Sequence, residues 1–180
     1  PTEAIRLDDT EKERTIQVGS VIVTTGVTPF NPSDMDNYQY ASYANVITSL
    51  EFERMLSAGG PMKGHVQRLS DGQQPSKIAW LQCVGSRDIN RCDNAYCSSV
   101  CCMYALKEAM LAKEHVHDDF EAAIFLMDMR TYGKEFEKYY ERAKADGVRF
   151  VRSRVHTITE DADGTLRFRY VSEAGKLQEE

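Results

Sequence analysis

Short apolar runs along the chain separate predicted strands from predicted helices. Alternating apolar and polar residues at 4–7 and 15–18, with a polar stretch between them, predict a β-hairpin. A β-branched run follows at 21–26, ends in glycine, and predicts a strand buried on both faces. The polar, tyrosine-rich stretch 31–45 comes after two prolines and is expected to be a connecting loop.

After residue 45 the pattern alternates between helical and strand periodicity. In chain order it predicts a helix at 48–56, a strand at 77–83, a helix at 98–115, a strand at 122–127, a helix at 133–145 and a strand at 148–151. The alternation from 77 to 151 is a βαβαβ unit, which implies a parallel sheet with right-handed crossovers. Runs at 155–159 and 166–171 flank an Asp-Gly turn and predict a β-meander hairpin. The predicted fold class is therefore α/β: a Rossmann-like, three-layer arrangement with a parallel sheet and a β-meander.

Composition narrows the function classes. The chain has 180 residues, enough for one domain with a real core, and a formal net charge of −6. The acidic balance argues against nucleic-acid binding, which needs a basic surface. No apolar run approaches the roughly 20 residues that span a bilayer, and the first residues lack the features of a signal peptide. We expect a cytoplasmic protein, or one peripheral to the membrane.

The turn after the strand at 77–83 is where a dinucleotide-binding unit carries Gly-x-Gly-x-x-Gly. Here it reads Cys-Val-Gly-Ser-Arg-Asp, so Gly85 is the only one of the three glycines present. We infer that the dinucleotide site of this frame has been lost or rebuilt. Arg87 and the adjacent Asp88 form a local ion pair or place a charge near the cysteines.

The cysteines are clustered. Of five, four fall within eleven positions (Cys92, Cys97, Cys101 and Cys102), and Cys83 ends the preceding strand. An odd, clustered set suits a disulfide framework badly and favours metal ligation or redox chemistry in a reducing compartment. Thiolates from a strand end, a loop and a helix N-terminus could hold a [4Fe–4S] cluster, which needs four cysteine sulfurs, and a helix N-terminus favours their negative charge.

Several alternatives stay open. The cysteines could be apolar core fillers, zinc ligands, or, for Cys97 and Cys101, a dithiol redox pair with one residue more than Cys-x-x-Cys. At the level of function, the chain could be a residual NAD(P)-binding or FAD-binding module with structural cysteines. It could also be a docking domain that holds partner subunits through its tyrosine-rich loop at 34–45.

Two motifs carry a family resemblance. Residues 82–88 (QCVGSRD) and 96–105 (YCSSVCCMYA) are similar to the A subunit of heterodisulfide reductase, and to the related A subunit of the quinone-interacting membrane-bound oxidoreductase complex. The likeness covers roughly residues 15–160, and the double-cysteine motif is highly specific.

The resemblance implies an oxidoreductase subunit with a thioredoxin-reductase-like core, in which FAD and iron–sulfur clusters carry electrons. It implies a cofactor-binding set and a metal-binding set. The first set is Thr24, Thr25 and Gly26 beside FAD, with Gly85 at the former dinucleotide turn; the second is Cys83, Cys97, Cys101 and Cys102 as ligands of [4Fe–4S]. Cys92 lies outside the motif.

The resemblance also implies a division of the chain. Residues 1–45 would end a flavin domain, and 46–180 would be the NAD-domain counterpart, with a cluster in place of the pyrophosphate. The flavin-binding glycine motif and the ferredoxin-like Cys-x-x-Cys-x-x-Cys runs of the family are absent. We therefore expect a fragment of a larger subunit that works with the other subunits of a heterodisulfide-reductase-like complex. Alone it should be inactive, bind FAD poorly, and lose its cluster in air.

Overall fold

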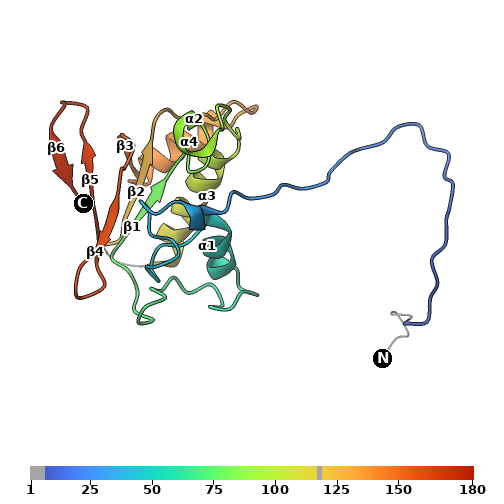
Figure 1. Ribbon diagram of the computed structural model, residues 1–180, viewed down its shortest axis with the longest axis horizontal. Helices are drawn as coiled ribbons and strands as arrows, with labels where there is room; N and C mark the ends of the chain where they lie inside the picture. Colours follow the sequence, from blue (N-terminus) through green and yellow to red (C-terminus); the bar gives the residue numbers. More distant parts are fainter. Residues whose placement is uncertain (1–6, 117–118) are drawn as a thin grey trace.

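The computed structural model describes residues 7–116 and 119–180 and shows a packed α/β body with an extended N-terminal arm (Figure 1). In chain order the elements are η1 (Pro32–Asp34), α1 (Ser49–Leu56), β1 (Lys77–Leu81), α2 (Ile89–Cys92), α3 (Cys101–His115), β2 (Glu121–Leu126), α4 (Glu137–Ala145), β3 (Arg149–Arg152), β4 (Ile158–Glu160), β5 (Leu166–Val171) and β6 (Leu177–Glu179). Within these ranges, none of the helices has the length and apolar character needed to cross a bilayer.

The first sheet is parallel, in the order β1-β2-β3. Leu81 of β1 lies opposite Phe125 of β2, and Phe125 lies opposite Val151 of β3. α3 connects β1 to β2, and α4 connects β2 to β3. The βαβαβ unit predicted from the apolar pattern is thus confirmed, and it brings the carboxyl ends of all three strands to one edge.

Alternate side chains of the parallel sheet face two different layers. On one face, Trp80 and Ile124 pack with α1, α3 and α4. On the other, Ala123 and Phe125 pack with the second sheet and with the loop before α1. Since β2 is buried along both faces, its near-continuous apolar run is the expected signature of a central strand. Figure 1 shows the resulting layers: helices, parallel sheet and meander.

The second sheet is an antiparallel meander in the order β4-β5-β6. Its inner residues Phe168 and Tyr170 meet the ring of Phe125 edge-on, with ring centroids 5.0 and 5.1 Å apart. The hairpin of β4 and β5 was predicted, whereas β6 was missed. β6 has three exposed residues and no alternating pattern that would mark it as a strand.

The sequence features that predict α1 are present in the structure. Thr48 and Glu51 form a reciprocal capping box, and Phe52, Met55 and Leu56 are the buried face. The helix therefore starts at the predicted hydroxyl cap and packs against α3 and Trp80.

Three elements are shorter than predicted because a residue next to each takes a left-handed backbone. β1 ends before Cys83 (φ 62°), α3 begins after Ser99 (φ 62°) and α4 begins after Glu135 (φ 66°). Such a conformation cannot continue a strand or a right-handed helix. Apolar spacing alone does not report it.

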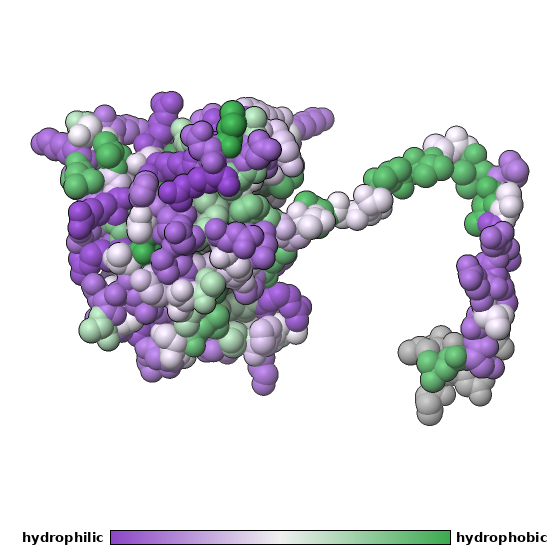
Figure 2. Space-filling view, viewed as in Figure 1, coloured by the Kyte–Doolittle hydropathy of each residue, from purple (hydrophilic) through white to green (hydrophobic). Residues whose placement is uncertain are grey.

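The strand prediction for the N-terminal arm is wrong for the described residues. The segment 15–26 forms no strand, and Val21, Ile22 and Val23 are 77%, 84% and 74% exposed. A strand needs a hydrogen-bonding neighbour, and none of the described residues pairs with this segment. Most of the other predicted hairpin strand, 4–7, lies outside the described residues. Figure 2 shows the arm's apolar stretch standing clear of the body.

Candidate functional site

Four of the cysteines lie at or near the carboxyl edge of the parallel sheet. Cys83 follows β1 by two residues, Cys101 and Cys102 are the first residues of α3, and Cys97 lies in the loop between them. In open α/β sheets this edge is where ligands bind, because strand ends and helix N-termini meet there. The fold thus brings all four predicted metal ligands to one region.

The loop that carries the cysteines has an unusual backbone. Among the described residues, seven other than glycine have a positive φ, and four of these are Cys83, Arg87, Asp93 and Ser99. Each such residue costs of order 1 kcal/mol or more and persists only where its surroundings hold it. The concentration of strain between residues 83 and 99 is typical of a functional loop.

Hydrogen bonds hold this loop in place. Asp88 caps α2 by accepting from the Arg91 amide at 3.1 Å, and its own amide donates to Asn94 O at 2.7 Å. The side-chain amide of Asn94 donates to Gly85 O at 2.8 Å. The loop predicted to be irregular thus contains a short helix and a β-bridge, which fix the chain between Cys83 and Cys97.

The thiols differ in burial and in proton affinity. Cys83 and Cys102 are buried, whereas Cys97 and Cys101 are half-buried. A hydrogen bond from Cys102 lowers the pKa of the Cys101 thiol and raises that of Cys102 itself. Desolvation raises the pKa of Cys83, and the nearby Cys101 adds to the effect. Cys101 is therefore the thiol that ionises first, and its charge acts on both neighbours.

The N-terminus of α3 is open toward the cysteines. Its N-cap residue, Val100, offers no side-chain hydrogen bond to the first-turn amides. A 15-residue helix without a polar cap leaves amide donors and the positive end of its dipole for a ligand or thiolate. The Ser99 amide, just before the helix, donates to Cys97 Sγ at 3.3 Å.

This donor set fits an iron–sulfur cluster by its chemistry. Across residues 7–116 and 119–180, no three Cys, His, Asp or Glu side chains are arranged around the position of a single ion. The four thiolates of a [4Fe–4S] cluster bind different iron atoms and do not converge on one point. Four neighbouring thiols beside an uncapped helix N-terminus supply the sulfur ligands and the favourable field that such a cluster requires.

Cys92, which the family motif leaves out, ends α2 and packs against the meander-facing core. Its half-buried thiol is free, as are the other four. The structure thus places Cys92 in contact with apolar neighbours, an environment suited to a small core residue.

The ion pairs around the site differ from the expected local pair. Arg87 contacts Asp128, which follows β2, and Asp88 contacts Arg154, which follows β3. Both pairs join segments far apart in the sequence across the carboxyl edge of the sheet. Because they depend on tertiary structure, no local pattern in the sequence signals either one.

Gly85 is covered by an aromatic ring. Its φ is 76°, and a Cβ built on it would lie 2.1 Å from Cγ of Phe30. The ring of Phe30 therefore sits where the backbone of a dinucleotide-binding turn would approach a pyrophosphate. A cofactor role for Gly85 stays a prediction, and the contact gives the glycine a packing role.

The other predicted cofactor residues lie in the arm. The segment 24–26 is exposed and extended, and nothing within 4 Å would meet a Cβ on Gly26. The structure does not bring Thr24 and Thr25 to the cysteines, and their contact with FAD stays a prediction.

The tyrosine-rich loop is used within the chain. Tyr38 is buried and donates to Val155 O at 3.1 Å, and Tyr40 donates to Glu51 at 3.0 Å. Tyr43 packs against the meander-facing core. These tyrosines cover the body of the protein, so they offer little free surface for a partner.

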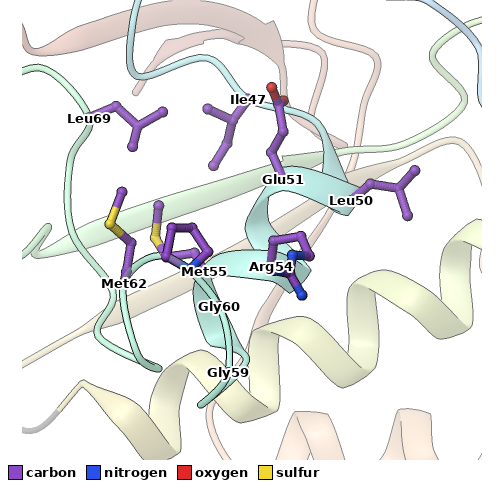
Figure 3. Close-up of a pocket in the computed structure, with 10 residues that line it drawn as sticks. Ile47, Leu50, Glu51, Arg54, Met55, Gly59, Gly60, Met62 and Leu69 are labelled. Atoms are coloured by element: carbon purple, nitrogen blue, oxygen red, sulfur yellow. The ribbon is translucent and has the colours of Figure 1, made fainter. Parts of the chain in front are cut away.

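A separate hollow lies beside α1 (Figure 3). Its apolar walls include Ile47, Leu50, Met55, Met62 and Leu69, with Glu51 and Arg54 among its polar residues. No cysteine lines it. It is therefore distinct from the cysteine site, although both involve elements that pack on α3.

Comparisons with known proteins point to one family, and no family model matches the chain. It is 47% identical over 163 residues to the first iron–sulfur A subunit of the CoB–CoM heterodisulfide reductase of Methanopyrus kandleri. It is 46% identical over 162 residues to the A subunit of the H2/formate:CoB–CoM heterodisulfide, ferredoxin reductase of Methanococcus maripaludis. These matches cover 89% of the chain and 24% of each relative. A third relative, from Methanosarcina acetivorans, is 38% identical over 99% of the chain and 23% of its own length.

Proposed function

This chain is homologous to a segment of the A subunit of heterodisulfide reductase, and on that premise we propose that it is an electron-transfer segment holding a [4Fe–4S] cluster. The ligands are Cys83, Cys97, Cys101 and Cys102. The chain spans about a quarter of the length of the curated relatives it matches. Flavin chemistry therefore belongs to the larger protein, with residues 1–45 as the end of its flavin domain and 46–180 as the cluster-bearing unit.

The observation that carries the proposal is the gathering of these four thiols between β1 and α3. When bound, the cluster supplies a one-electron carrier. The chain's residues do the rest: Cys101 ionises readily beside Cys102, the open N-terminus of α3 favours negative charge, and the strained loop fixes Cys83 relative to the helix.

A residual dinucleotide site has less support. The glycine pattern that admits a pyrophosphate is reduced to Gly85, and the Phe30 ring fills the space in front of it. Saturable NADPH binding that survives replacement of the cysteines by serine would favour this alternative.

Partner subunits are part of the proposal, since the relatives' names describe subunits of larger reductases. Tyr96 and Val100, which flank the cysteines in sequence, are 71% and 60% exposed. Exposed apolar side chains beside a redox site favour a protein surface that approaches it, because electron transfer needs close contact.

Anaerobic reconstitution with ferrous iron and sulfide tests the proposal. We expect a brown protein with about four iron atoms per chain and an EPR signal after reduction. The same chain offered Zn²⁺ alone separates the zinc alternative. A colourless chain that takes up no iron after careful reconstitution contradicts the proposal.

A further inference from the structure

Arg87 is a fixed cation beside the cysteine site. Its backbone is left-handed (φ 54°), and its amide donates to Tyr96 O at 3.1 Å. Its side chain is only 21% exposed, and its guanidinium lies within hydrogen-bonding reach of the Cys83 thiol. Both the loop and the burial restrict where this charge can be.

Asp128 holds the guanidinium from the other side. Arg87 donates to both carboxylate oxygens, with Nη2 to Oδ2 at 3.3 Å. Arg130 donates to the same oxygens at 3.1 and 3.2 Å. The Cys102 thiol faces the Asp128 carbonyl oxygen at 3.9 Å. Two arginines thus share one carboxylate, and the group has a net charge of +1 next to the thiols.

The shared carboxylate stays ionised, because hydrogen bonds from Arg130 and then Arg87 lower the pKa of Asp128. It therefore opposes part of the arginine charge at all pH values near neutrality. The two ends of the Arg87–Asp128 pair act on a nearby charge with opposite signs.

Net charge and hydrogen bonds to sulfur set the reduction potential of an iron–sulfur cluster. Reduction adds one negative charge, so a fixed cation stabilises the reduced form more than the oxidised form. We propose that Arg87 is a positioning residue that raises the reduction potential of the centre at the four cysteines, and that Asp128 limits this effect. The inference rests on the proposed function and deepens it.

A redox titration followed by EPR tests the inference on the anaerobically reconstituted chain. Dithionite supplies one electron to the centre through mediator dyes, and no bond or proton at Arg87 changes. At the wild-type midpoint potential, Arg87→Gln should lower the ratio of reduced to oxidised centre by roughly tenfold. Asp128→Asn should raise the ratio, and Arg87→Lys should stay near the wild-type value.

Arg169→Gln is the matched control, since it removes the same charge from the exposed meander. It should leave the midpoint unchanged. Iron content is measured for every variant, so that loss of the centre is not mistaken for a shift in its potential. Because Asp128→Asn should shift the midpoint in the opposite direction, the inference can still fail if Arg87→Gln does not fold.

The possible failures can be told apart. A wild-type chain that binds no iron overturns the proposed function and this inference together. Iron-loaded variants whose midpoints all equal the wild-type value overturn the inference alone. The same holds if Arg87→Gln and Asp128→Asn shift the midpoint in the same direction.

Discussion

The indole Nε1–H of Trp80 donates a 2.9 Å hydrogen bond to Oε2 of Glu108 inside the helix-facing core. Glu108 is 4% exposed, and no described residue hydrogen-bonds to its other carboxyl oxygen. Burial raises the pKa of Glu108 to about 8, so the carboxyl stays protonated at neutral pH. The pair joins β1, the strand that precedes Cys83, to α3, the helix that begins with Cys101.

The raised pKa of Glu108 makes stability depend on pH. The folded chain holds this proton up to about pH 8, whereas the unfolded chain releases it near its ordinary pKa of 4.5. The free energy of unfolding from this group is therefore highest below that pKa and falls as pH rises to about 8.

Glu108→Gln removes this dependence and keeps an acceptor for Trp80. We expect the variant to match the wild type near pH 5 and to exceed it by roughly 2–4 kcal/mol at pH 9. Urea unfolding at pH 5, 7 and 9 measures the difference. Glu114→Gln, at an exposed position of the same helix, is the control; identical pH profiles for all three proteins would refute the prediction.

Two adjacent glycines after α1 should respond differently to alanine. A Cβ on Gly60 would lie 1.8 Å from the Arg54 carbonyl oxygen, whereas nothing lies within 4 Å of one on Gly59. Because the obstacle is helix backbone, Gly60→Ala should lower the free energy of unfolding by about 1–3 kcal/mol. Gly59→Ala should change it by less than about 0.5 kcal/mol. Equal effects of the two substitutions in thermal or urea unfolding would show that the close approach is absent.

Gly85 and Gly26 form a second matched pair, because both have a positive φ and only Gly85 is covered. Gly85→Ala adds a Cβ against the Phe30 ring as well as backbone strain, and we expect it to cost about 1–3 kcal/mol. Gly26→Ala lies in the exposed arm and should leave the unfolding of the body unchanged. The prediction fails if Gly85→Ala is as stable as Gly26→Ala in urea.

The cysteines should separate into ligands and a bystander. Cys101→Ser and Cys102→Ser should each lose most of the iron that the wild type takes up on reconstitution, because serine does not replace a thiolate ligand well. Cys92→Ser should retain the wild-type iron content, since that thiol packs in the core. Iron analysis and visible absorption measure both. Loss of iron in the Cys92 variant with retention in the other two would reverse the assignment.

Much of the fold could be predicted from local pattern. The capping residues Thr48 and Glu51 fix the start of α1, and the apolar run of β2 marks a central strand. Such signals lie within a few residues of each other, so apolar spacing and capping chemistry suffice to find them. The ends of β1, α3 and α4 could not be found in this way, because left-handed residues such as Cys83 and Ser99 set them.

For the site, the sequence by itself determined the donor set: the spacing of Cys83, Cys97, Cys101 and Cys102 identifies four candidate thiolates. Tertiary structure alone decided their surroundings. It seats Phe30 on Gly85, pairs Arg87 with Asp128, and leaves the β-branched segment of the arm exposed. The physical reason is that thiol chemistry belongs to the residue, whereas packing, ion pairing and strand formation need a partner that the fold brings close.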